Sequence, residues 1–246
     1  MKSYVFILIV LIAGFSSGIV YGFINFVTTE PFLDSAIELE NRAKFQAGEE
    51  KDSPEFRAEY NGYRYWQKSG MVLAGGIYGL ATGSLFGIVY AYSRKVLPGK
   101  HEIQKALVLG GLMWFTVFMI PFLKYPANPP TVGDPNTVVY RAILYLSFIA
   151  ISGLGALAFY RLYKKLPKNK KLLAFADYAV FISIAFVMMP QNPDKVLAPM
   201  DLVNGFRTMS ATTVTVYWVV NAVILGALWQ RFQTRHELQK ELDRHS

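Results

Sequence analysis

Six long apolar runs set the limits on how this chain can fold. Each is about 18 residues or longer and nearly free of charged side chains. A helix of about 20 apolar residues crosses a bilayer, and only a helix satisfies its own backbone hydrogen bonds there. The sequence therefore predicts an all-α, polytopic membrane helical bundle. The predicted transmembrane helices cover residues 4–27, 71–92, 106–123, 142–160, 172–189 and 211–229.

The composition agrees with this class of protein. Hydrophobic residues make up 53% of the chain and charged residues only 17%, whereas about a quarter of a soluble domain is charged. We therefore expect one transmembrane domain over residues 1–246. The first run exceeds the apolar core of a signal peptide, which is about 7–15 residues long, and no small-x-small cleavage site follows it. We expect it to remain as an uncleaved helix.

The positions of lysine and arginine predict the orientation of the bundle. Segment 161–171 holds six basic residues, and short basic loops stay in the cytoplasm. This places both termini in the cytoplasm, the N-terminus at Lys2 and the C-terminus in a tail over 231–246. The cytoplasmic pieces then hold 15 of the 25 lysines and arginines. We expect a multi-pass protein of a prokaryotic cell membrane.

The net charge of +8 is therefore mainly a signal of topology. Basic loops beside anionic lipid account for it better than nucleic-acid binding does, so membrane lipid is an expected partner and nucleic acid is not. The loops predicted to lie outside are 28–70, 124–141 and 190–210.

Two of these outer loops contain the same short motif. Residues 126–129 read Pro-Ala-Asn-Pro and residues 190–193 read Pro-Gln-Asn-Pro, and Arg141 and Arg207 follow 13–15 residues after the asparagines. Arg64 has the matching place in the first outer loop. Three repeated helical hairpins would produce this pattern. The alternative is that Pro, Asn and Arg are frequent at helix ends.

The outer loops are rich in oxygen ligands. Carboxylates, asparagine amides and rigid prolyl carbonyls suit a hard or borderline divalent cation. Equally, Arg141 and Arg207 could pair with Asp134, Asp194 or Asp201 and only fix the loop geometry. The candidate ion-binding residues are Glu30, Asn128, Asp134, Asn192 and Asp194, and the candidate organisers are Pro126, Pro129, Pro130, Pro190, Pro193, Arg141 and Arg207.

The first outer loop has two helix-start signals. One is Thr29-Glu30-Pro31 and the other is Ser53-Pro54-Glu55. After the second, Phe56, Tyr60 and Tyr63 fall on one helical face. We expect interfacial helices in 28–70, the second of them aromatic and lying back on the bundle.

Glycines recur at every fourth position in the first two spans. Small residues at this spacing let two helices approach closely where lipid provides no hydrophobic drive. We therefore expect the first two helices to pack on these faces. In the last span, Asn221 could hydrogen-bond across helices or contact substrate. The packing glycines are Gly14, Gly18, Gly22, Gly75, Gly79, Gly83 and Gly87.

Several classes of site are excluded or unsupported. The chain has no cysteine, and its three histidines, His101, His236 and His245, all fall on the predicted cytoplasmic side. Thiolate metal sites and membrane-embedded bis-histidine haem are therefore excluded. No P-loop, GxSxG or HExxH pattern occurs, so we expect no enzyme and no bound cofactor. The residues do not identify a metal.

The proline-rich run over residues 122–137, followed by Arg141, resembles the signature of the CbtA family. The resemblance extends to Glu30-Pro31 and to Asn192-Pro193 with Phe206-Arg207. It implies a cobalt transporter subunit tied to cobalamin supply, beside a small single-span, His-rich partner, CbtB. Members are usually described with about five spans. Five spans are therefore an alternative here, in which 106–123 or 172–189, the shortest spans, would be re-entrant or misread.

The residues and the resemblance together predict an integral membrane subunit of an uptake transporter for a divalent cation, with cobalt as the expected ion. The outer loops would form its entry site. Co²⁺ would be the transported ion. The alternative is a non-transporting structural or assembly subunit of a larger membrane complex. An oligomer is compatible with either function.

Overall fold

The part of the chain that the structure describes contains helices and connecting loops, and no strands. The computed structural model describes residues 3–130, 132–196 and 198–245, so Lys2 and Ser246 of the predicted cytoplasmic ends lie outside the described residues. The main helices are α1 (Ser3–Thr28), α2 (Glu30–Ala47), α3 (Pro54–Ser93), α4 (Glu102–Met113), α5 (Ile120–Lys124), α6 (Val138–Lys165), α7 (Lys171–Met188) and α8 (Met200–His245).

The six predicted spans are confirmed. Six helical stretches in the described chain are long and apolar enough to cross a membrane, including both of the shortest predicted spans. The third combines α4, a π-helix η1 (Trp114–Met119) and α5. Pro121 explains the π-helical turn, because proline lacks an amide hydrogen and its ring clashes with the carbonyl four residues earlier. The five-span alternative is not needed.

The helices group into two compact units. One contains residues up to Gly111 together with those from Thr208 onward, and the other contains residues 112–207. Each unit is described by itself.

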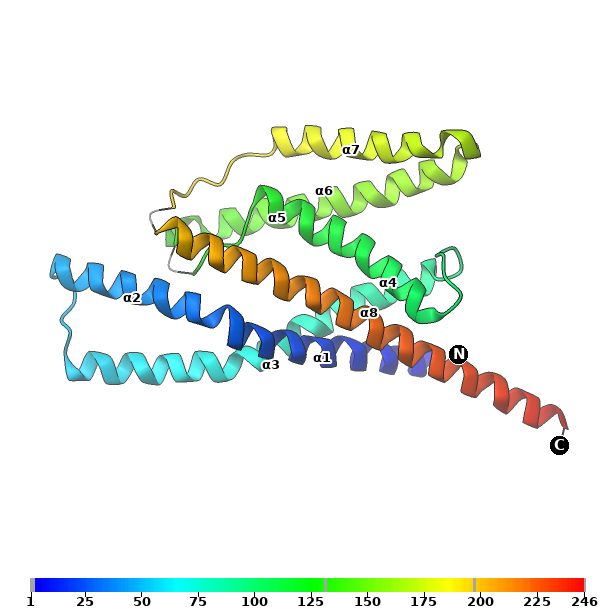
Figure 1. The fold of residues 1–246 in the computed structure, drawn as a ribbon, viewed down its shortest axis with the longest axis horizontal. Coiled ribbons are helices and arrows are strands. Elements are labelled where there is room, and N and C mark those ends of the chain that lie inside the picture. Colours follow the sequence, from blue (N-terminus) through cyan, green and yellow to red (C-terminus); the bar gives the residue numbers. More distant parts are fainter. Residues whose placement is uncertain (1–2, 131, 197, 246) are drawn as a thin grey trace. The chain divides into compact units, whose positions relative to one another are not determined.

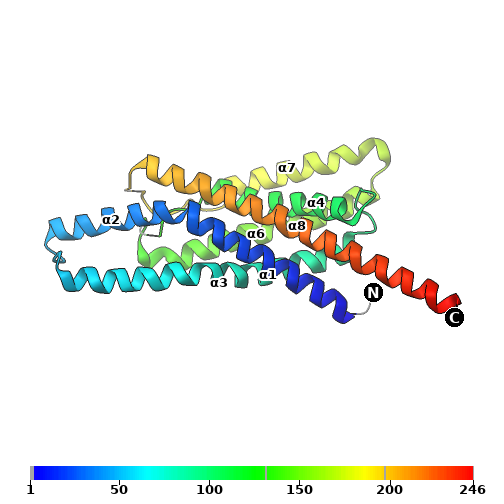
Figure 2. The same cartoon turned by 60° about the horizontal axis from the view of Figure 1, so that its bottom comes forward.

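In the first unit, α1 and α3 cross at their glycine faces, and the two helices run side by side in both views (Figures 1 and 2). A methyl group on Gly79 would lie 2.6 Å from the Cα of Gly18, and one on Gly83 would lie 2.5 Å from the Cα of Gly14. Gly22 faces the backbone of α3, and Gly87 faces Val10. All seven predicted packing glycines therefore lie between these two helices.

Helix α8 packs across this crossing with polar and aromatic side chains. The Ser17 hydroxyl of α1 lies 3.3 Å from Oδ1 of Asn221, which is fully buried. Near the other end of α1, Thr213 donates to Oδ1 of Asn25 at 3.2 Å. Asn221 thus makes the interhelical contact that was one of its two predicted roles.

The first outer loop folds into a helical hairpin. Only Thr29 separates α1 from α2, and Pro31 stands at the start of α2. At the far end, the Ser53 hydroxyl accepts a hydrogen bond from the Phe56 amide at 3.2 Å and caps α3. Both predicted helix starts are therefore present. Residues 54–70 differ from the expected separate interfacial helix, because they continue into the second span without a break.

The second unit is built on α6. Ser152 of α6 donates to the Thr116 carbonyl in the π-helix at 2.5 Å, and Tyr178 of α7 donates to the Ser152 carbonyl at 3.1 Å. Around these contacts, Phe148 packs against Tyr125 and Phe186. The turn between α6 and α7 consists of a short 3₁₀ helix, η3 (Lys168–Lys170). The proline-rich loops lie at the other end of α6 and α7, before α6 begins and after α7 ends.

The glycine crossing predicts a position-specific cost for a single methyl group. Gly79→Ala should destabilise the chain by about 1–3 kcal/mol, because its methyl would meet backbone atoms that cannot move aside. Gly70→Ala on the same helix is the control, since nothing lies within 4 Å of its added methyl. Thermal unfolding in detergent measures both. Equal melting temperatures for the two variants would contradict this packing.

Candidate functional site

The candidate site lies in the second unit, where the proline-rich loops meet. Arg141, near the start of α6, places Nε 2.9 Å from Oδ2 of Asp194, which follows the second Pro-x-Asn-Pro motif. The Asp194 side chain is only 3% exposed, and its other oxygen accepts from the Thr137 hydroxyl at 2.6 Å. A buried carboxylate requires such compensation. The arginine after one motif therefore neutralises an acid in the other loop.

A second contact runs in the opposite direction. Arg207, near the start of α8, donates from Nε and Nη2 to Oδ1 of Asn128 at 3.2 and 2.8 Å. Asn128 belongs to the first motif and Arg207 follows the second. The Tyr125 hydroxyl adds a third link by donating to the Pro190 carbonyl at 2.6 Å. The two loops are thus linked reciprocally by non-covalent contacts, because each arginine binds the loop that carries the other motif. We call them the cross-linked loops.

Local turns hold these side chains in place. The Asp134 carboxylate accepts from the Asn136 amide at 2.8 Å and starts the short helix η2 (Pro135–Thr137). Asn192 likewise accepts from the Asp194 amide at 3.0 Å. Gly133 has a φ of 122°, and a methyl there would lie 3.0 Å from Nη1 of Arg141. A glycine is therefore required beside the ion pair.

A cavity of about 410 Å³ opens between the loops. Its lining includes Asn128, Asn192 and Arg141, together with Tyr125 and Tyr145. Prolines from the first motif provide much of the remaining wall. Among the described residues that line it, Arg141 is the only charged one, and its partner Asp194 is not part of the lining. The described lining thus contains two asparagine amides and one guanidinium, and no carboxylate.

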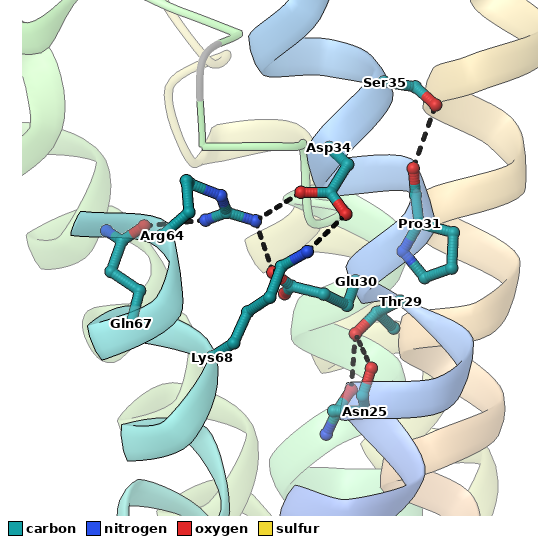
Figure 3. A network of polar contacts seen from close by, with 9 residues as sticks. All are labelled: Asn25, Thr29, Glu30, Pro31, Asp34, Ser35, Arg64, Gln67 and Lys68. Carbon is teal, nitrogen blue, oxygen red and sulfur yellow. Dashed lines mark hydrogen bonds and ion pairs between the residues drawn. The ribbon is translucent and has the colours of Figure 1, made fainter. Parts of the chain in front are cut away.

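Glu30 lies in the first unit, within a separate ionic network (Figure 3). Arg64 of α3 reaches between Glu30 and Asp34 of α2, pairing with Glu30 and donating to Asp34 at 2.8 Å. Lys68, one turn further along α3, donates to Asp34 at 2.7 Å. The Glu30 and Arg64 side chains are 4% and 7% exposed. This network fixes the hairpin of α2 against α3.

The structure brings together only some of the predicted ligands. Asn128 and Asn192 line the loop cavity, and Asp194 pairs with Arg141, which also lines it. Asp134 is exposed and serves as a helix cap. Of the predicted organisers, Pro129 is buried, Pro126 and Pro130 line the cavity, and Pro190 accepts the tyrosine hydrogen bond, whereas Pro193 is exposed. Among the described residues, no group of three His, Asp or Glu side chains is arranged to hold a metal ion.

Sequence reasoning missed several residues of these networks. Asp34 and Lys68 were not selected, although Glu30 and Asp34 are spaced i, i+4, as are Arg64 and Lys68. This spacing places two acids on one face of α2 and two bases on one face of α3. Thr137 and Tyr125 gave no comparable signal, because their partners lie more than 50 residues away in the chain.

The buried pair in the first unit predicts a large effect of charge removal. Arg64→Gln should destabilise the chain by about 3–5 kcal/mol, because it leaves the Glu30 carboxylate buried without its partner. Arg42→Gln is the matched control, since its pair with Glu38 is exposed and should contribute less than about 1 kcal/mol. Denaturation of both variants in detergent is the measurement. An Arg64 effect no larger than that of Arg42 would contradict the network.

The same network predicts an acid-sensitive step. Burial raises the pKa of Asp34, but hydrogen bonds from Lys68 and Arg64 outweigh it and hold the pKa below the ordinary value. A lowered pKa stabilises the fold fully above the ordinary value of 3.8, and the contribution is lost as the pH falls through the lowered one. Asp34→Asn should therefore flatten the melting temperature profile between about pH 2 and pH 5. An unchanged acid limb in this variant would refute the linkage.

The fold defines a polytopic helical membrane protein with cross-linked loops at one end of its second unit. A model of the CbtA family, described as probable cobalt transporter subunit, matches residues 4–230. The chain therefore belongs to the CbtA family, and the resemblance stated from the proline-rich run is confirmed. No curated protein and no solved structure matches the chain.

Proposed function

We propose that this chain is the membrane-spanning subunit of an uptake transporter for a divalent cation, with Co²⁺ as substrate and the cross-linked loops as the entry. The family match and the six spans support transport by a membrane subunit. The observation that carries the entry site is the reciprocal binding of Arg141 to Asp194 and of Arg207 to Asn128. It concentrates oxygen ligands around one cavity at the end of the bundle.

The ion pair suggests how the entry would work. Arg141 competes with a cation for the Asp194 carboxylate, because both bind the same oxygens. A divalent ion would replace the guanidinium and would gain the nearby Asn128 and Asn192 amide oxygens. Arg141 therefore keeps the empty site neutral and makes binding reversible, which uptake requires.

A partner with imidazole ligands fits this scheme. Borderline Co²⁺ prefers nitrogen ligands, and none of the three histidines lies in the outer loops. The family description names a subunit, so the chain acts together with another. We propose a small single-span, His-rich, CbtB-like partner that provides the stronger ligands, while the loops described above receive the ion.

A series of charge-neutralising variants, measured in vesicle uptake assays, tests the entry site. Asp194→Asn and Arg141→Gln should each lower the melting temperature, because each leaves one buried charge unpaired. The double variant Arg141→Gln/Asp194→Asn should restore much of that stability, since both charges are then gone. If Asp194 binds the ion, Co²⁺ uptake should stay at least tenfold below wild type in the restored double variant.

The series separates the entry site from a purely structural pair. Recovery of uptake together with stability in the double variant would show that Asp194 only holds the loops and would overturn its role as a ligand. Arg42→Gln, in an exposed pair of the first unit, is the control and should leave uptake unchanged.

The competing function is a non-transporting structural or assembly subunit. One observation favours it: the carboxylates of Glu30, Asp134 and Asp194 are all engaged by partners within the chain. Under this function the loops would only dock another subunit. Removal of Asp194 would then weaken co-purification of the partner and leave uptake per assembled complex unchanged.

A further inference from the structure

A cluster of basic and aromatic residues lies at the opposite end of the second unit, where α6 turns into α7. Segment 161–171 holds six basic residues and no acid. Within the described part of the chain, none of the six has a carboxylate partner. The six are Arg161, Lys164, Lys165, Lys168, Lys170 and Lys171.

Two of these lysines are held over tyrosine rings. Tyr160 and Tyr163 are stacked, with ring centroids 6.4 Å apart and planes 14° from parallel. Nζ of Lys164 lies 5.7 Å from the Tyr160 centroid, and Nζ of Lys171 lies 4.6 Å from the Tyr163 centroid. Phe175 supports Tyr163 edge-on at 5.6 Å. The rings thus favour positions of the two ammonium groups close to the helix ends.

The place of the cluster in the fold determines what it can meet. It joins two helices that are each long and apolar enough to span a membrane, over residues 135–165 and 168–188. The turn between them must therefore lie at a membrane surface, at the depth of lipid headgroups. Some exposed basic residues elsewhere are neutralised locally, as Arg42 and Lys44 are by Glu38 and Glu40. The 161–171 cluster is uncompensated.

We propose that Tyr160, Tyr163, Lys164 and Lys171 form a binding site for the headgroup of an anionic phospholipid. A phosphodiester without a cationic substituent complements two fixed ammonium groups, whereas the choline of a zwitterionic lipid cancels its own phosphate charge. The tyrosine rings contact the upper acyl and glycerol region, where such amphipathic side chains are favoured. The other four basic residues attract anionic lipid from further away. The site is independent of the proposed entry loops.

Lipid retention by the full-length chain tests this site. The purified protein is placed in nanodiscs of phosphatidylcholine and phosphatidylglycerol, extracted mildly, and its bound lipids are counted by native mass spectrometry. Phosphatidylglycerol should be retained selectively. Lys164→Gln/Lys171→Gln should reduce that retention about tenfold or more, because two headgroup-level charges are lost. Arg42→Gln/Lys44→Gln removes the same charge elsewhere and should retain the wild-type level.

A second variant separates a built site from simple charge. Tyr160→Leu/Tyr163→Leu keeps all six basic residues and removes only the rings, and it should lower phosphatidylglycerol retention several-fold. Wild-type retention in either the lysine or the tyrosine variant would overturn the proposal. So would equal retention of phosphatidylcholine by the wild-type chain, or an equal loss in the Arg42/Lys44 control.

Discussion

Three arginines, on α3, α6 and α8, must find oxygen partners, and this requirement organises the polar networks of both units. Arg64, Arg141 and Arg207 each follow an aromatic residue. Arg64 and Arg207 bind residues that precede their own helices in the chain, whereas Arg141 pairs with Asp194, which follows α6. Since a guanidinium remains charged at all accessible pH values, its partners cannot be removed without leaving an uncompensated charge. These contacts consequently fix the shape of the loops.

The two units differ in how tightly their helices pack. In the first unit, α1 and α3 meet at glycines so closely that their backbones touch, and the fully buried Asn221 of α8 closes one side of the crossing. In the second unit, α7 buries only Ala174 among its residues and leaves most of its apolar side chains exposed. A membrane helix with so little internal contact is suited to lipid or to another subunit. The family description of the chain as a subunit agrees with this difference.

The sequence predicted the helices well because their signals are local. Apolar length identified six spans, and Ser53 and Pro54 marked the start of α3 correctly. The continuity of α3 was harder to predict, because polar residues of 54–70 end the apolar run without ending the helix. The π-helical turn in the third span likewise depends on the backbone's response to Pro121.

The candidate site was predictable only in part, because the choice of partner depends on the fold. The sequence showed that Arg141 and Arg207 needed oxygen ligands and offered three aspartates. Arg141 pairs with Asp194, one of those three, but Arg207 binds the amide of Asn128 instead. No local pattern distinguishes these outcomes, since the contacts join loops 53 and 79 residues apart.

The most direct test of the account is Co²⁺ uptake into sealed vesicles that contain the purified chain together with the proposed His-rich partner. Vesicles containing the partner alone, and vesicles containing the chain with the Asp194→Asn/Arg141→Gln substitutions and the partner, are measured alongside. The account predicts accumulation of Co²⁺ only in the vesicles with the wild-type chain and partner. Equal accumulation with the partner alone, or none in any vesicle, would contradict it.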